Sequence, residues 1–264
     1  MTIGELAIPK KRKITSGTKE WADHNVNCVR GCFNNCRYCY AKTMAKRFGR
    51  CKDDTWKDMV VNSRAVEKKY GKYKGRVMFP SSHDIIDQPE VREACLIVIK
   101  KLLEAGNEVL VTTKPKLSIT KEIVDKFSYF KGMLQFRFTI TSLDNQLLSF
   151  WEPDAPTYEE RFDSLRHAYE NGFKTSVSVE PFLDSTPQTL IHTLSPYVTE
   201  SIWLGPMNYI PQNGFSREDE QKYTEIRKRY EIGHLKQIYE EMKAFPLIKF
   251  KDSMTNRLNA AGGA

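Results

Sequence analysis

The sequence contains no long hydrophobic run. Its 264 residues are 40% hydrophobic, with a mean hydropathy of −0.53. No stretch approaches the roughly 20 apolar residues that a membrane-spanning helix needs. The segment MTIGELAIPKKRK has no apolar core after its charges, so no secretory leader is expected. These absences predict a cytoplasmic protein with no membrane partner, long enough for one large domain or two small ones.

Internal repeats and low-complexity blocks are absent, and the cysteines are too few and too unevenly spaced for a disulfide framework. The chain has six cysteines, three of them in one short stretch, which fits metal binding in a reducing compartment better than a disulfide framework. The second Cys-x-x-Cys pair that a zinc ribbon needs is also absent. What is present is the pattern Cys-x3-Cys-x2-Cys, formed by Cys32, Cys36 and Cys39.

The three clustered thiols predict an iron–sulfur centre. Thiolates are soft ligands that favour iron–sulfur clusters, zinc or copper(I), and cluster-binding proteins gather closely spaced cysteines in one loop. A structural metal centre normally closes its shell with four protein ligands, whereas a reactive centre leaves one position open. Three cysteines therefore indicate an iron with an open coordination position.

Cys28 leaves a second interpretation open. Together with the three clustered cysteines it would complete a four-thiolate zinc site or a closed cluster. It lies, however, in residues 25–29, which are predicted to form the first strand, and a strand cysteine is most often a small buried hydrophobe. For Cys51, just after the cluster, the alternatives are an incidental cysteine and a thiol near the site.

The chain carries an excess of positive charge. Its formal net charge is +8 and its pI is near 9.0, which favours anionic partners such as nucleic acid or nucleotides. The lysines and arginines are spread through helix-like stretches, where a solvated face is the ordinary interpretation. Charge alone therefore makes nucleic acid or a nucleotide a candidate partner without establishing it.

Strands and helices alternate after the cysteine stretch, which is typical of βαβ units and a parallel sheet. Six strands are expected, at residues 25–29, 77–79, 108–112, 134–140, 175–179 and 201–204. The intervening helices are expected at residues 40–48, 90–104, 118–127, 158–170 and 187–194. Right-handed crossovers then predict an α/β fold, a partial (β/α)6 TIM-type barrel of parallel strands with a C-terminal helical extension.

Composition divides the chain into four segments. Residues 1–22 are predicted to form a basic N-terminal arm, and residues 23–210 the barrel core. Residues 211–258 contain a long charged helix, interrupted around Gly233, and a strand that closes the edge of the barrel. Residues 259–264 have the composition of a flexible tail.

Polar residues recur where the predicted strands end. Ser82 and Asp84 follow the second strand, Ser142 the fourth and Glu180 the fifth. In a parallel barrel these ends meet at one face, where binding sites lie. Each residue alone fits turn chemistry, but their recurrence predicts a site at this end.

With Tyr38 directly before Cys39, the cysteine pattern resembles that of the radical S-adenosylmethionine (radical SAM) superfamily. The resemblance implies that Cys32, Cys36 and Cys39 hold a [4Fe-4S] cluster whose open iron binds the methionyl group of S-adenosyl-L-methionine. It implies reductive cleavage of this cofactor to a 5′-deoxyadenosyl radical, which abstracts hydrogen from a substrate. An electron donor such as flavodoxin or ferredoxin is implied as a partner.

Within the superfamily, the chain resembles the spore photoproduct lyase-like group, also described as DNA repair photolyase-like. The matching segments are Ser82-His83-Asp84, Gln88-Pro89-Glu90, Thr113-Lys114, Glu152-Pro153, Ala155-Pro156 and Arg161. They occur in the family's order, which implies a lyase-like radical enzyme. No counterpart of the lyase's hydrogen-returning cysteine is evident beyond Cys51 or Cys95, so photoproduct repair itself is not expected.

The resemblance also assigns residues to the cofactor. It places Tyr38 against the adenine, and Ser82 and Asp84 near the methionyl amino group, although the family's usual Gly-Gly-Glu is absent here. No catalytic residue beyond the cofactor ligands is assigned.

Ser142, Arg161 and Glu180 are the candidates for the carboxylate and ribose of the cofactor. Arg161 offers the fork that a carboxylate needs, and Glu180 can accept hydrogen bonds from ribose hydroxyls. The alternative for Arg161 is a surface salt bridge with Glu159 or Glu160.

Two functions follow. The first is a radical SAM enzyme acting on an unidentified substrate, with nucleic acid or a nucleotide as the candidate. The alternative is a non-catalytic nucleic-acid-binding module built on a closed four-cysteine zinc or iron–sulfur site that includes Cys28.

Overall fold

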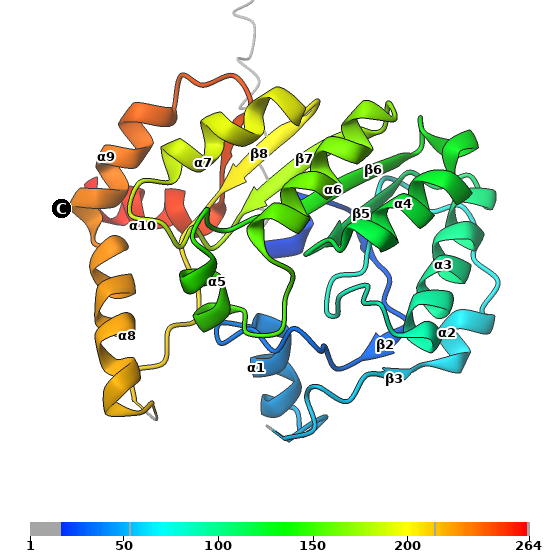
Figure 1. Cartoon of the computed structure of the whole chain (residues 1–264), viewed down its shortest axis with the longest axis horizontal. Helices are drawn as coiled ribbons and strands as arrows, with labels where there is room; N and C mark the ends of the chain where they lie inside the picture. The colour runs from blue at the N-terminus through cyan, green and yellow to red at the C-terminus, as the bar shows by residue number, and fades with distance from the viewer. Residues whose placement is uncertain (1–16, 53, 214, 263–264) are drawn as a thin grey trace, which may run out of the picture.

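The computed structural model describes residues 17–52, 54–213 and 215–262 (Figure 1). Within them, seven strands form one sheet in the order β1-β4-β5-β6-β7-β8-β9, and every neighbouring pair is parallel. These strands are β1 (His24–Asn25), β4 (Val77–Phe79), β5 (Val109–Thr113), β6 (Leu134–Thr139), β7 (Lys174–Val179), β8 (Ser201–Leu204) and β9 (Ile248–Phe250). The predicted α/β fold with a parallel partial barrel is confirmed.

Helices connect successive strands and cover the outer face of the curled sheet (Figure 1). They are α3 (Pro89–Glu104), α4 (Leu117–Lys126), α5 (Asn145–Trp151), α6 (Tyr158–Glu170) and α7 (Pro187–Leu194). Proline occupies the first turn of α3 and α7, where its missing N–H costs nothing. Thr157 caps α6 by accepting a hydrogen bond from the Glu160 amide.

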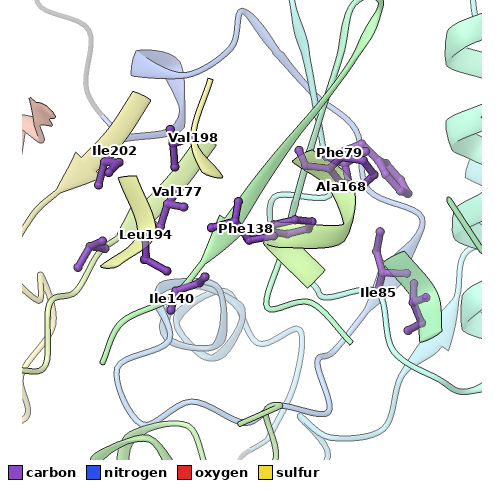
Figure 2. Close-up of a cluster of buried hydrophobic side chains, with 14 of the residues drawn as sticks. Phe79, Ile85, Phe138, Ile140, Ala168, Val177, Leu194, Val198 and Ile202 are labelled. Atoms are coloured by element: carbon purple, nitrogen blue, oxygen red, sulfur yellow. The ribbon is translucent and has the colours of Figure 1, made fainter. Parts of the chain in front are cut away.

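Strand β6 shows how the two faces of the sheet differ. Phe136 and Phe138 point outward and stack with their ring centroids 5.1 Å apart, and Figure 2 shows Phe138 among other buried apolar side chains, including Val177. Because side chains alternate along a strand, Gln135 and Arg137 point to the opposite, inner face. The core therefore lies between sheet and helices, whereas the barrel interior is partly polar.

The N-terminal region differs from the expected first strand. The chain joins the sheet only at β1, and residues 29–30 form β2 (Val29–Arg30), which pairs antiparallel with β3 (Val60–Val61) outside the sheet. Asn27 explains the early departure, because its Oδ1 accepts hydrogen bonds from the amides of Ser81 and Ser82 at 2.7 and 3.0 Å. A side chain thus takes the place of further ladder bonds.

The remaining elements before the C-terminal region are short. They are η1 (Gly17–Glu20), α1 (Tyr40–Arg47), α2 (Ser63–Glu67), η2 (Ser128–Phe130) and η3 (Ser195–Tyr197). Trp21 follows η1 and packs edge-on against Trp203, with ring centroids 6.0 Å apart. The N-terminal segment therefore covers the barrel interior from residue 17 on, and the rest of the predicted basic arm lies outside the described residues.

The C-terminal region corrects two expectations. The charged stretch forms two separate helices, α8 (Arg217–Arg229) and α9 (Ile232–Met242), because buried Tyr230 turns inward and donates a hydrogen bond to the Phe182 carbonyl at 2.6 Å. The last segment, α10 (Asp252–Gly262), continues through most of the predicted flexible tail and is anchored by buried Met254. The predicted closing strand is confirmed as β9.

Across the described part of the chain, each helix is too short or too polar to cross a membrane.

Candidate functional site

The three clustered cysteines lie in the cysteine loop, residues 31–39, between β2 and α1. Gly31 begins the loop with φ +86°, and a Cβ there would lie 2.6 Å from the Asp58 carbonyl oxygen, so only glycine fits. The Cys32 amide donates to the Trp56 carbonyl at 2.9 Å. At the other end Cys39 caps α1, its Sγ accepting from the Lys42 amide at 3.4 Å. Both ends of the loop are thereby fixed.

The loop thiols are free and sheltered. Cys36 is buried, and Cys32 and Cys39 are half-buried. Burial raises the pKa of Cys36 to about 12 and raises those of Cys32 and Cys39. The thiols therefore keep their protons at neutral pH, and metal binding has to displace them.

The spacing of the loop sulfurs distinguishes between kinds of metal centre. In the described residues, one group of three potential ligands has all its donor atoms within 4.8 Å of one another, and it does not contain the loop thiols. A tetrahedral zinc ion with Zn–S bonds of about 2.3 Å holds its sulfurs about 3.8 Å apart. The three loop sulfurs are therefore not all within 4.8 Å of one another, so they are not gathered around one point as the sulfurs of a single zinc ion are.

Behind the loop lies a buried ion network formed by Lys114, Glu152 and Arg161. Arg161 Nη2 lies 2.5 Å from Glu152 Oε2, and both side chains are fully buried. Lys114 Nζ is 3.9 Å from Glu152 Oε1. Glu152 also accepts hydrogen bonds from the hydroxyls of Tyr38 and, at 2.8 Å, Thr141. The network therefore ties Tyr38, inside the cysteine loop, to the barrel.

The members of the ion network are charged. Burial raises the pKa of Glu152, but Arg161 and Lys114 outweigh burial and the net pKa is lowered, so the carboxylate is ionised. Burial likewise lowers the pKa of Lys114, while Cys36 and Glu152 outweigh it and keep the ammonium charged. Two buried cations, Lys114 and Arg161, therefore lie near Cys36, with the carboxylates of Glu152 and Asp84 beside them.

Asp84 is buried and fully hydrogen-bonded. Its Oδ1 accepts from the Thr113 hydroxyl and, at 2.8 Å, from the Ile85 amide. Its Oδ2 accepts from Asn34 Nδ2 at 2.7 Å and from the Lys114 amide at 2.9 Å. Asp84 thus holds the cysteine loop, through Asn34, against the end of β5.

Arg161 and Ser142 are placed differently from the expectation. Arg161 is fully buried and pairs with Glu152, so the alternative of a surface salt bridge with Glu159 or Glu160 is wrong. Because Arg161 is fully buried, its guanidinium is not exposed to carboxylates in the solvent. The Ser142 hydroxyl, equally buried, donates to Asp184 and accepts from the Asp144 amide at 2.8 Å.

Glu180 belongs to a second buried network, on the other side of the barrel. Its Oε2 lies 3.7 Å from Lys251 Nζ, which also pairs with Glu20 and stands 4.5 Å from the centre of the Trp21 ring. Burial raises the pKa of Glu180 to about 7. Of the predicted cofactor residues, the structure brings Tyr38, Asp84 and Arg161 to the cysteine loop and leaves Glu180 apart.

A cavity of about 540 Å³ opens beside the cysteine loop, and Ser82 lies in its wall. Arg30, Arg50 and Tyr40 also line it, together with Cys51. Tyr40 is 54% exposed, and its ring lies 6.0 Å from that of Tyr209. Guanidinium groups and an accessible aromatic ring suit a planar, anionic ligand.

Sequence reasoning missed Lys114, Glu152 and Asn34 as members of the site. Lys114 stood among the polar strand ends and in a family segment, and Glu152 in a family segment, but neither was given a role, because a charged residue after a strand or a short helix ordinarily faces solvent. A lysine directly after five buried strand residues, 109–113, was the available signal that the side chain has to find a partner inside.

Comparison with known proteins adds independent evidence. The profile of the Radical SAM superfamily matches residues 26–194. The uncharacterized protein ORF301 of Acidianus two-tailed virus is 30% identical over 172 residues, 61% of this chain and 55% of that protein. The uncharacterized protein MJ0683 of Methanocaldococcus jannaschii is 26% identical over 230 residues, 86% of this chain and 85% of that protein.

Among solved structures, SuiB of Streptococcus suis bound to S-adenosylmethionine is similar with a TM-score of 0.49 and 11% identity. The match covers 86% of this chain and 51% of SuiB. The chain thus spans about half the length of both SuiB and the viral relative.

Proposed function

The chain belongs to the radical SAM superfamily, and from this premise we propose that it is an enzyme whose cysteine loop holds a [4Fe-4S] cluster through Cys32, Cys36 and Cys39. The observation that carries the proposal is the triad of sheltered thiols with two buried cations, Lys114 and Arg161, behind it. We assign residues 23–210 to the catalytic core and the following residues to an extension that covers it.

When bound, the cluster supplies one electron that cleaves S-adenosylmethionine to methionine and a 5′-deoxyadenosyl radical. The chain's own residues prepare the site for it. Lys114 and Arg161 stabilise the thiolates that form when the loop cysteines lose their protons. Glu152 keeps the two cations together and fixes the Tyr38 ring by accepting its hydroxyl proton. We assign that ring to the adenine of the cofactor.

Asp84 and Arg161 act as positioning residues in this proposal. Asp84 holds both Asn34 and the backbone of Lys114, so the cysteine loop and its nearest cation keep one relative position. Arg161 holds Glu152 and, through Nε, the Pro156 carbonyl at 2.8 Å. Both side chains are buried and bonded within the protein, which is the support for this positioning role.

We propose that the substrate is a nucleotide or nucleic acid and enters the cavity beside the loop. The support is the cavity wall, where Arg30 and Arg50 offer positive charge and Tyr40 an exposed ring. We further propose that the reaction is lyase-like, as in the spore photoproduct lyase-like group, and that it takes place in the cytoplasm. Flavodoxin or ferredoxin is the proposed electron donor.

The alternative of a closed four-cysteine site receives no support. Cys28 Sγ lies 3.8 Å from Cys95 Sγ, in a buried group with His83 that contains none of the loop thiols. A non-catalytic module built on four cysteines would need Cys28 to turn toward the loop.

The experiment is anaerobic incubation of the iron- and sulfide-loaded, dithionite-reduced protein with S-adenosylmethionine. We expect about four irons per chain and formation of 5′-deoxyadenosine, both abolished by Cys36→Ala. Cys51→Ala removes a thiol outside the loop and serves as the matched control for iron content. An intact cluster without cleavage, even with nucleotides and single-stranded DNA present, would overturn the proposal.

A further inference from the structure

Cys28, His83 and Cys95 form a second group of potential metal ligands, the buried trio. Their donor atoms all lie within 4.8 Å of one another. They come from three separate segments: the turn before β2, the loop after β4 and the middle of α3. Both cysteines are fully buried, and His83 is 7% exposed. No part of the proposed cofactor chemistry uses these side chains.

The distance between the two sulfurs matches metal coordination. Cys28 Sγ and Cys95 Sγ are 3.8 Å apart, whereas a disulfide bond is about 2.05 Å long. Two thiolates bound to one tetrahedral zinc ion at about 2.3 Å lie about 3.8 Å apart. The pair is therefore already at the separation that a shared zinc ion requires.

His83 is oriented as a metal-binding histidine. Its Nδ1 lies 3.0 Å from the Asp84 carbonyl oxygen, so Nδ1 carries the proton and Nε2 keeps its lone pair. Metal-bound histidines commonly donate their second ring N–H to a backbone carbonyl in this way. Nε2 at present accepts a hydrogen bond from the Cys28 amide at 3.2 Å, at the long end of the usual range. A metal ion would replace that contact.

Charge balance also suits a divalent ion. Two thiolates, one neutral imidazole and Zn²⁺ sum to zero, so the loaded site can lie in the core without an unpaired charge. Two sulfurs and one imidazole are a donor set that zinc prefers, with the fourth position left for water.

We propose that the buried trio binds one zinc ion. The ion links Cys28, just before β2 and the cysteine loop, to α3 and to the loop after β4. With three protein ligands the ion keeps one coordination position open, and it holds Cys28 in place without contacting the loop thiols. The proposal does not depend on the radical chemistry, because the two metal sites share no ligand.

The test measures zinc and iron together in the full-length protein. The chain is purified anaerobically, loaded with iron and sulfide, given one equivalent of zinc chloride, desalted and analysed by plasma mass spectrometry. We expect one zinc per chain in the unaltered protein and loss of zinc in both Cys28→Ala and Cys95→Ala, with iron retained. Cys36→Ala should lose iron and keep zinc, and Cys51→Ala should keep both metals.

Three results would overturn the proposal. The first is an unaltered protein that is folded by circular dichroism and loaded with iron, yet retains no zinc. The second is zinc that disappears with Cys36→Ala but stays with Cys95→Ala, which would place it in the cysteine loop. The third is a Cys28–Cys95 disulfide in peptide mapping of the anaerobically purified chain, which would make the pair a redox couple. Retained iron in Cys95→Ala excludes misfolding as the cause of zinc loss.

Discussion

The first cysteine of the loop, Cys32, and the first of the buried trio, Cys28, are four residues apart, yet the two groups gather their ligands in different ways. The loop takes its thiols from one continuous segment, leaves them half-sheltered and has the ion network of Lys114, Glu152 and Arg161 behind it. The trio takes its donors from three segments, closes them within 4.8 Å and has a sulfur pair in direct contact. Loop sulfurs that are not gathered around one point suit a cluster, and donors within 4.8 Å of one another suit a single ion.

The largest effect on this comparison is expected from Glu152→Gln. The amide removes the charge that pairs with Arg161 and leaves a guanidinium buried with no carboxylate, which costs about 3 to 5 kcal/mol of unfolding free energy. The network supports only the loop, so iron retention and cofactor cleavage should fall while the zinc content of the folded protein stays unchanged. Urea unfolding and metal analysis of the same preparation check both parts.

Glu159→Gln is the matched control for that substitution. Glu159 lies seven residues along the chain from Glu152, on the exposed side of α6, where its carboxylate accepts from Asn145 at 2.9 Å. We expect little change in stability or iron content. If Glu152→Gln unfolds at the same urea concentration as this control, the ion network does not support the loop.

Asp84→Asn sharpens the comparison, because Asp84 is the residue that both groups share. Its carboxylate holds the loop through Asn34, and its backbone carbonyl orients His83 in the trio. The amide keeps the backbone but turns one acceptor oxygen into a donor that faces two other donors, which costs about 2 to 4 kcal/mol. Iron loading should therefore weaken while zinc binding persists.

Metal analysis again separates the two groups, with Asp87→Asn as control. The Asp87 carboxylate pairs with Arg92 and Lys116 at a partly exposed position, so its loss should change neither metal. Equal loss of iron and zinc in Asp84→Asn would show that the loop and the trio form one cooperative unit.

The two groups also show what the sequence can and cannot predict. The loop was predictable because its ligands are neighbours in the chain and their spacing alone indicates the chemistry. The trio was not, because Cys28 and Cys95 are separated by 67 positions and each, taken alone, reads as a small apolar core residue. Only the packing of β4 and α3 against the segment around Cys28 brings them together.

The same distinction explains the rest of the fold. Alternating apolar runs predicted β5 through β8 and their helices, since each forms from local periodicity. The first strand was misplaced because the Asn27 side chain, bonded to Ser81 and Ser82, diverts the chain through a contact 54 positions away. The surface salt bridge considered for Arg161 was wrong for a similar reason: nothing in the sequence of α6 indicates that Arg161 pairs with buried Glu152.

Glu180→Gln is expected to have the smallest effect, and one that depends on pH. Its network with Lys251 lies apart from both cysteine groups, and Lys251 keeps Glu20 as a partner in the variant. Burial raises the pKa of Glu180 from 4.5 to about 7, so between these values the folded state binds more protons than the unfolded state. Unfolding free energy contributed by this group therefore falls as pH rises through that window.

The variant cannot titrate at this position, so the difference in unfolding free energy between the two proteins isolates Glu180. Between about pH 5 and about pH 8 the unaltered protein should lose about 1 to 3 kcal/mol of unfolding free energy relative to the variant. Groups that are present in both proteins contribute equally to the two measurements and cancel. Urea unfolding at the two pH values measures the shift, and a difference that stays constant would mean that Glu180 is ionised throughout, held by Lys251 more strongly than burial opposes it. Because neither metal site contributes to this difference in unfolding free energy, its size is the reference with which the larger losses of stability expected at the loop are compared.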